Sequence, residues 1–417
     1  MKKNIVLAVG LLAAASLTIS KPCSAAFVIG GENGWQLSTD GIVDVFSTYE
    51  SATKAPTGSR FASFLNGSDG TYENFGVTVG LLPSVIAFNV KAPTVNGVES
   101  TVRVGIYPSI QNSTAQNNRF DVNPNTDFRE FFYTAKGKSG ELLAGRALNL
   151  YQGKNILTDM TLLTAGVVPA PGTSTTLGHI GYGYLYTNFG PQIRYTTPDL
   201  SGVKVAVSIG EPYKIDQNTS KTNTPRFETE ISYATTNGDT SLQAWLSGLY
   251  QTATRSKTAA ARPGDDNHSL GGAAGIQAGF GKINLMASGY VGEGLGMISV
   301  QDGSYQGAWG SSAVDAAGKE RTQYGFLAQA SYQLTPEFKL GINYGQSAQE
   351  KSDYDKDNDA PGDYVPMETQ EAASLIAVYN FNKFTQFVID YSYAQNTWMD
   401  DKTQHSNSVA VGTMFYW

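Results

Sequence analysis

Cysteine, histidine and long hydrophobic runs are all scarce in this chain of 417 residues. It has one cysteine, Cys23, and three histidines, whose spacing does not suit a zinc site. After residue 26, no apolar run reaches the ~18 residues that a membrane-spanning helix needs. The G-x-S-x-G, Walker and H-E-x-x-H motifs are absent, so we expect no enzymatic activity. The formal net charge of -7 argues against nucleic acid as a partner.

The N-terminus carries the pattern of an export signal. Two lysines precede an apolar run from residue 5 to residue 19, and the small residues Ser24-Ala25-Ala26 stand at the expected cleavage positions. This pattern predicts a secretory signal peptide over residues 1–26, cleaved after Ala26. Because Cys23 would leave with it, the remaining domain, residues 27–417, is expected to hold no cysteine. Disulfides, thiol catalysis and cysteine-ligated metal are then excluded.

What the chain does contain is alternation with a period of two. From residue 35 onward, segments recur in which apolar side chains occupy every second position, and helical periodicity is almost missing. Residues 203–210 and 338–345 are clear examples. Glycine (45 residues) and tyrosine (23 residues) are abundant, as expected where only every second side chain meets an apolar environment. The pattern predicts antiparallel strands with one apolar and one polar face.

Connections of two lengths alternate along the chain. The short, turn-like ones lie at 93–97, 137–140, 199–202, 237–239, 279–282, 335–337 and 380–383. The longer polar ones lie near 52–80, 112–127, 151–190, 214–225, 255–268, 298–320, 351–366 and 400–406. Short turns on one rim and long loops on the other are typical of a transmembrane β-barrel, here with about sixteen strands. A secreted tandem all-β protein would alternate similarly, but it would not explain the alternating loop lengths.

The last strand, residues 409–417, adds a signal of its own. Alternate residues from Val409 to Trp417 share one face, which indicates a lipid-facing strand with an aromatic residue at the membrane–water interface. Such a strand resembles the terminal signal that the barrel assembly machinery of bacterial outer membranes recognises. Phe415 and Trp417 would carry that signal, although such strands usually end in Phe. We therefore expect the protein in the cell outer membrane.

Four segments resemble the general porins of Gram-negative bacteria: residues 80–93, 102–111, 128–163 and 188–202. In that family a Gly-Arg step, here Gly145-Arg146, leads into a long third loop. The resemblance implies a homotrimer of sixteen-stranded barrels, each with a water-filled pore narrowed by its inward-folded third loop. The acidic P-E-F-G-G motif of enteric members is absent, so the resemblance does not settle the ion preference.

Arginines on the early strands are the candidates for one side of the narrowing. Arg103 and Arg194 alternate with apolar neighbours and are therefore expected to point inward. The resemblance implies the same orientation for Arg129 and Arg146. Arg146 has an equal alternative, in which it pairs with a carboxylate at the trimer contact.

The third loop is expected to supply the opposite charge. Asp159 is its only carboxylate between Asn149 and Ile180, and Lys154 is a basic candidate in the same loop. Asp159 is expected to face the arginines, unless it only bonds to loop backbone, as aspartate often does in turns. Opposed charges across a narrow gap would make the pore weakly selective, and Asp159→Asn would then favour anions.

One acidic loop is a weak candidate for cation binding. Asp353, Asp355, Asp357 and Asp359 stand at alternate positions, as in the start of an EF-hand loop, but Ala360 and Pro366 break that motif. The loop could bridge lipopolysaccharide phosphates through Ca²⁺ or Mg²⁺, or it could be a solvated acidic loop. No other cofactor is expected.

Rival functions remain at this stage. The main expectation is passive diffusion of small hydrophilic solutes and ions. A sugar- or organic-anion-specific channel is the alternative, and a surface adhesion or receptor barrel is a further one. A sugar channel should show a track of aromatic residues along its lumen. Only Phe46, Tyr107, Trp245 and Tyr290 have the inward parity, which is too few for such a track.

The terminal strand gives the first testable prediction. Deleting the last two residues, or changing Trp417 to Asp, should block assembly of the barrel. A carboxylate at the interface loses the favourable partitioning of the aromatic ring and the recognition signal with it. The measurement is the amount of the protein at the cell surface, and normal levels of the Trp417→Asp variant would contradict the prediction.

Overall fold

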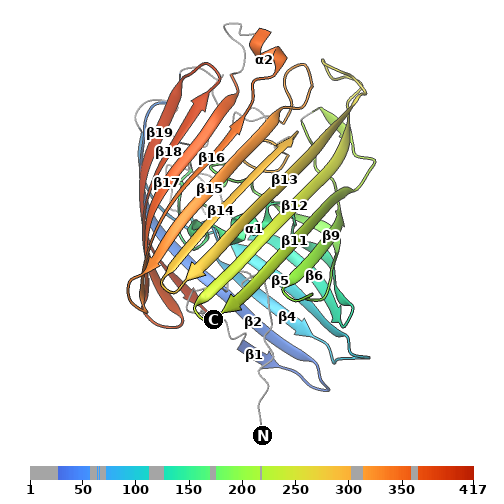
Figure 1. The fold of residues 1–417 in the computed structure, drawn as a ribbon, viewed down its shortest axis with the longest axis vertical. Helices are drawn as coiled ribbons and strands as arrows, with labels where there is room; N and C mark the ends of the chain where they lie inside the picture. The colour runs from blue at the N-terminus through green and yellow to red at the C-terminus, as the bar shows by residue number, and fades with distance from the viewer. Residues whose placement is uncertain are drawn as a thin grey trace.

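A computed structural model describes residues 27–56, 63, 65, 72–111, 126–169, 175–216, 218–301, 313–357 and 365–417. They form one closed antiparallel sheet of tilted strands (Figure 1). The predicted signal peptide, residues 1–26, lies outside the described residues. The strands are β1 (Phe27–Gly30), β2 (Gln36–Ala52), β3 (Tyr72–Thr78), β4 (Val85–Lys91), β5 (Glu99–Pro108), β6 (Thr126–Gly137), β7 (Gly140–Leu148), β8 (Phe189–Thr196), β9 (Val203–Gly210), β10 (Thr219–Lys221), β11 (Arg226–Asn237), β12 (Thr240–Arg255), β13 (Asp266–Phe280), β14 (Ile283–Glu293), β15 (Thr322–Gln333), β16 (Phe338–Gln349), β17 (Met367–Asn380), β18 (Thr385–Trp398) and β19 (Thr403–Tyr416).

The barrel wall has sixteen strand positions, because β3 and β4 together fill one position and β1 and β10 are short additions. β3 and β4 pair with the two halves of β2 and therefore act as one interrupted strand. β1 adds to the lower end of β2, and β10 is a short ribbon on β12. β19 pairs with β2 and closes the sheet. The expected antiparallel barrel of about sixteen strands is confirmed.

The barrel is apolar outside and polar inside, the reverse of a soluble domain. On β12, Leu246 faces outward and is 55% exposed, whereas Gln243 and Ser247 face inward and are buried. The same alternation runs through the other strands, because a lipid-facing wall needs an apolar residue only at every second position. The inner face therefore decides what the barrel can hold.

The last residue, Trp417, packs over Gly41 where β19 pairs with β2 and closes the barrel. Gly41 and Trp417 exchange two backbone hydrogen bonds of 3.2 Å between their N and O atoms. The indole ring of Trp417 lies where a side chain at position 41 would stand. Position 41 therefore requires glycine, since any larger residue would collide with the ring.

The predicted turns and loops mostly fall where expected. Each predicted short turn lies at a connection between consecutive barrel strands. In Figure 1 the C-terminus lies at the end opposite the short helix α2 (Asp353–Asp357). Several predicted loops were too long: β3 lies inside 52–80 and β10 inside 214–225, and β6, β13 and β19 begin inside 112–127, 255–268 and 400–406. Among the described residues, no helix has the length and apolarity to cross a membrane.

Candidate functional site

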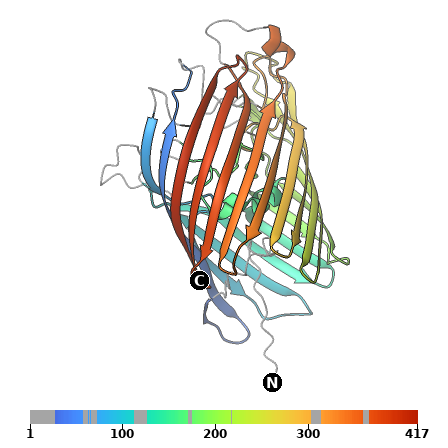
Figure 2. The ribbon, with the colours of Figure 1, turned by 60° about the vertical axis from the view of Figure 1, so that its left-hand side comes forward.

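The segment from Asn149 to Asn188 leaves the wall after β7 and folds into the barrel. It contains the short helices α1 (Gly153–Thr158) and η2 (Met160–Leu163), and most of its described residues are buried. Figure 2 shows α1 behind the strands of the wall, at middle height. We call this segment the inner loop. Its place in chain order is that of the expected third loop.

Amide, hydroxyl and carboxylate side chains of the wall bind the backbone of the inner loop. Gln329 of β15 accepts from the backbone N–H of Met160 at 3.0 Å. Asp390 of β18 accepts from the N–H groups of Ala165 and Gly166, both at 2.9 Å. Buried backbone groups must be paired, so the wall supplies the partners that the irregular loop does not supply to itself. The bonds anchor the loop to this side of the barrel.

His179 is a second anchor of the inner loop and is fully buried. Its Nε2 lies 2.9 Å from Oδ1 of Asn343 on β16, and its Nδ1 lies 3.0 Å from the carbonyl oxygen of Tyr182. The hydroxyl group of Tyr182 donates to Asn396 of β18 at 3.0 Å. Strands β15, β16 and β18 therefore all hold the loop by hydrogen bonds.

The inward aromatic residues also hold the loop. The indole N–H of Trp245 donates to Asn155 Oδ1 at 2.9 Å. Phe46 clusters with Ala165, and Tyr290 with Tyr151. All these side chains are buried. Of the four inward aromatic residues, Phe46, Trp245 and Tyr290 thus pack against the inner loop and do not line an open track, which weakens the sugar-channel alternative.

Asp159 does not face the arginines, so the predicted acidic pole is wrong. It is 3% exposed and lies within the inner loop. Its carboxylate accepts from the N–H of Thr161 at 2.9 Å, the N–H of His179 at 3.3 Å and the hydroxyl group of Tyr184 at 2.7 Å. The alternative reading, in which Asp159 bonds to the loop itself, is the one that the geometry supports.

Arg103 points into the barrel, as expected, but its charge is matched. It donates to Glu130 Oε2 at 2.8 Å and forms an ion pair with Asp40 at 3.0 Å. Its Nη1 also donates to Asn89 at 3.1 Å. Two carboxylates therefore share one guanidinium group on this wall, and the cluster carries an excess of negative charge.

Arg194 and Lys154 form a second charged cluster with acidic residues of β11. Arg194 faces inward, as expected, and its Nη1 lies 3.4 Å from the carbonyl oxygen of Leu148. Arg194 and Lys154 both act electrostatically on Glu230. The neighbouring Glu228 accepts from two backbone N–H groups of the inner loop, at 2.7 and 3.2 Å. Our sequence reasoning missed Glu228 and Glu230, although their alternation with Phe227 and Ile231 marks them as inward.

Arg129 and Arg146 lie in different environments. Arg129 stacks inside the barrel, with its Cζ 4.9 Å from the ring centre of Tyr107. Arg146 is exposed and pairs in register with Phe131, whose side chain is 62% exposed on the outer face. The expected inward orientation of Arg146 is therefore wrong. Its outward position agrees with the alternative of a contact outside the barrel.

The acidic loop is occupied by an ion pair. Asp355 accepts from Arg321 Nε at 2.9 Å and from Nη2 at 2.7 Å. Burial alone would raise the pKa of Asp355, but the hydrogen bonds and charge of Arg321 outweigh it and hold the pKa below its usual value. Asp353 and Asp357 are exposed, and Asp359 lies outside the described residues. Among the described residues, no group of three or more His, Cys, Asp or Glu is placed to hold a metal.

Comparisons with known proteins agree with this architecture. The family model described as Gram-negative porin matches residues 6–398. The structure of the outer membrane channel DcaP of Acinetobacter baumannii is similar at a TM-score of 0.66 and 16% identity, covering 94% of this chain and 100% of that one. An anion-selective porin from Comamonas acidovorans is similar at a TM-score of 0.61 and 13% identity, and the match covers 92% of this chain and 100% of that one. A trimer form of OmpT, an outer membrane protein of Vibrio cholerae, is similar at a TM-score of 0.52 and 13% identity, and the match covers 92% of this chain and 100% of that one. No curated protein matches the sequence.

The position of Asp159 yields a prediction opposite to the one from sequence. Asp159→Asn should loosen the inner loop, because the new NH₂ group would face donors and leave them unpaired, at a cost of about 1–3 kcal/mol. The open-channel current should become noisier, while the reversal potential in a salt gradient stays near that of the parent protein. A quiet channel with a shift toward anions would show that Asp159 acts on permeating ions directly.

Proposed function

The chain belongs to the Gram-negative porin family, and we propose that the pore of this outer-membrane channel runs between the inner loop and the charged part of its wall. The channel serves the passive diffusion of small hydrophilic solutes and ions. Family and fold are those of a channel rather than of an enzyme.

The anchoring of the inner loop carries this proposal. The hydrogen bonds described above join the loop to β11, β12, β15, β16 and β18, and Leu81 and Leu82 before β4 bind it as well. β5, β6 and β9 receive none of them. Arg103 of β5 and Glu130 of β6 point into the barrel from this remaining side, and Arg194 does so from β8, which lies between β6 and β9 in the sheet. Charged groups keep water around them, which favours an aqueous passage at this wall.

We propose that the field across this passage has the reverse of the polarity expected from sequence. Lys154 brings positive charge on the loop, next to Arg194 and Glu230. On the opposite side, Asp40 and Glu130 share the single charge of Arg103. Charges of both signs in a narrow gap give weak selectivity, set by the balance between the two clusters.

Reversal potentials of two variants test the passage directly. Lys154→Gln should shift the pore toward cations, and Glu230→Gln should shift it toward anions. One charge a few ångströms from the ion path is worth roughly 1–4 kcal/mol at an effective dielectric between bulk water and a protein surface. The shifts should fade at high salt, where screening is strong.

Lys257→Gln is the matched control, since it removes the same charge from an exposed position on an external loop. Its reversal potential should equal that of the parent protein. If Lys154→Gln and Glu230→Gln also leave the reversal potential unchanged at low salt, the pore lies elsewhere.

Three copies of the chain are proposed to associate through the outer face around β6 and β7. An arginine on a lipid-facing wall costs about 2–4 kcal/mol near the membrane midplane, so the exposed Arg146 favours a protein neighbour there. The similar OmpT structure in a trimer form gives further support. Light scattering in mild detergent should give the mass of three barrels, and a mass of one would contradict the proposal.

Export and insertion are also proposed to follow the sequence signals. We propose that residues 1–26 are removed, that the barrel assembly machinery recognises Phe415 and Trp417, and that lipopolysaccharide contacts the outer rim. Phe415 supports the second point, because it is 48% exposed on the outer face. N-terminal sequencing of the protein purified from outer membranes should begin at Phe27, and a first residue of Met1 would contradict cleavage.

A further inference from the structure

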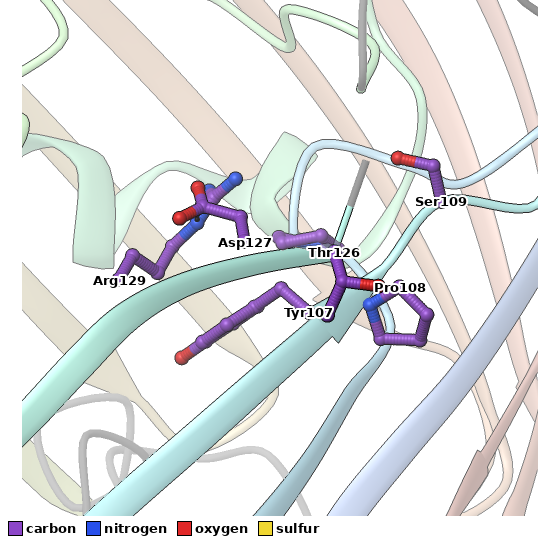
Figure 3. Close-up of a pocket in the computed structure, with 7 residues that line it drawn as sticks. Tyr107, Pro108, Ser109, Thr126, Asp127 and Arg129 are labelled. Carbon is purple, nitrogen blue, oxygen red and sulfur yellow. Dashed lines mark hydrogen bonds and ion pairs between the residues drawn. The ribbon is translucent and has the colours of Figure 1, made fainter. Parts of the chain in front are cut away.

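A small cavity lies inside the barrel at the outer ends of β5 and β6. Its volume is about 300 Å³. Figure 3 shows the side chains around it, with Arg129 and Asp127 on one side and Pro108 and Ser109 on the other. The lining residues are Pro83, Tyr107, Pro108, Ser109, Thr126, Asp127 and Arg129. This volume is at the lower end of the range of small-molecule sites.

Arg129 and Asp127 present opposite charges to this cavity. Arg129 Nε donates to Asp127 Oδ2 at 2.9 Å. Within the described part of the chain, this guanidinium group donates its hydrogen bond through Nε, which leaves its two terminal nitrogens for another acceptor. The side chain of Asp127 is 51% exposed and that of Arg129 is 15% exposed. The cavity therefore borders both a group that can bind an anion, Arg129, and a group that can bind a cation, Asp127.

Aromatic rings fix the plane of the guanidinium group. Arg129 Cζ lies 4.9 Å from the ring centre of Tyr107 and 5.7 Å from that of Phe189. The position of Arg129 follows from an irregularity in the pairing of β5 and β6, where Gly105 pairs with Glu130 and Tyr107 pairs with Asp127. The extra residue on β6 turns Arg129 onto the ring of Tyr107.

A buried network holds Tyr107 in turn. Its hydroxyl group donates to Glu130 Oε2 at 2.7 Å, and the same carboxylate accepts from Arg103 at 2.8 Å. A side chain at position 105 would stand within 2.9 Å of both Glu130 and the Tyr107 ring, so only glycine fits there without displacing them. The charged pair thus lies on a rigid support, which lowers the entropy cost of binding a solute.

From this geometry we infer a subsite for small zwitterions of the α-amino acid class. The carboxylate of the solute binds the terminal nitrogens of Arg129, its ammonium group binds the free edge of Asp127, and its side chain lies against Pro83 and Pro108. A simple anion would meet the charge of Asp127, and a simple cation would meet that of Arg129. A solute that carries both charges satisfies both groups.

The inference rests on the proposed function, because the subsite acts only on solutes that enter the pore. The test uses the full-length protein in planar bilayers, with L-alanine, propionate and ethylamine as probes. Propionate and ethylamine each keep one of the two charged groups of alanine. L-alanine should produce transient interruptions of the ion current at concentrations at least about tenfold lower than either analogue, as expected for one added charge-assisted hydrogen bond.

Arg129→Gln and Asp127→Asn should each weaken the alanine effect by about tenfold, and the double variant should weaken it little further, because either charge needs the other to select a zwitterion. The external pair Arg262 and Asp265 gives matched controls, since its Nε–Oδ2 distance is 3.2 Å and it lies on an external loop, with Asp265 exposed and Arg262 half-buried. Arg262→Gln and Asp265→Asn should leave the alanine effect unchanged.

Distinct results separate the two claims. A protein that inserts but carries no ion current would contradict the proposed function. A conducting channel on which alanine, propionate and ethylamine act alike would overturn the zwitterion subsite and leave the channel intact. An alanine effect that survives both Arg129→Gln and Asp127→Asn would place amino-acid binding elsewhere in the pore and overturn the assignment to this cavity.

Discussion

The structure depends on pairing the backbone of an irregular loop inside a barrel. The inner loop from Asn149 to Asn188 crosses the lumen with little regular secondary structure, so much of its backbone cannot bond to itself. Gln329, Asp390 and Glu228 are inward-facing wall residues that accept hydrogen bonds from its backbone N–H groups. Breaking one such bond would leave a buried polar group unpaired, which costs about 1–3 kcal/mol. The inner face of β11 to β18 is thus a docking surface for the loop.

This arrangement divides the wall into two parts. The docking part is rich in amides, hydroxyls and inward aromatic residues, and the loop covers it. The remaining part carries clusters around Arg103 and Arg194, in which charges of both signs lie close together. Polar residues on an inner face therefore have two uses in this barrel, because some bind the loop and others meet water. Both uses involve carboxylates: Asp390 and Glu228 accept from backbone N–H groups of the loop, whereas Asp40 and Glu130 pair with Arg103 on the part of the wall that the loop does not bind.

The sequence predicted those features that a period of two determines. It gave the barrel, the short turns and the inward orientation of Arg103 and Arg194, because apolar neighbours mark the outer face unambiguously. The inward orientation of Arg146 came from the family resemblance and was wrong; its neighbours in residues 142–148 are apolar or small on both faces, so the alternation there gave no parity to correct it. β3 was missed, since its glycine and polar residues resemble a loop.

The contacts of the loop residues could not be predicted from the alternation of apolar and polar residues. Asp159 was expected to act in the pore because it is the one carboxylate in that stretch of loop. Its partners, Thr161, His179 and Tyr184, become neighbours only when the loop folds back on itself. The ion pair of Asp355 with Arg321 likewise joins residues 34 positions apart in two external segments. Such contacts depend on tertiary structure, and no local pattern in the sequence reports them.

Chemical accessibility of the two parts of the wall tests the central claim most directly. The sequence after residue 26 has no cysteine, so single cysteines can be introduced without background. Arg194→Cys lies on the charged wall, and Ser374→Cys lies under the inner loop, where Ser374 is 1% exposed. A charged thiol reagent should block the current of Arg194→Cys and leave that of Ser374→Cys unchanged. Equal or faster modification of Ser374→Cys would contradict the claim that the loop covers that wall and that the pore follows the other.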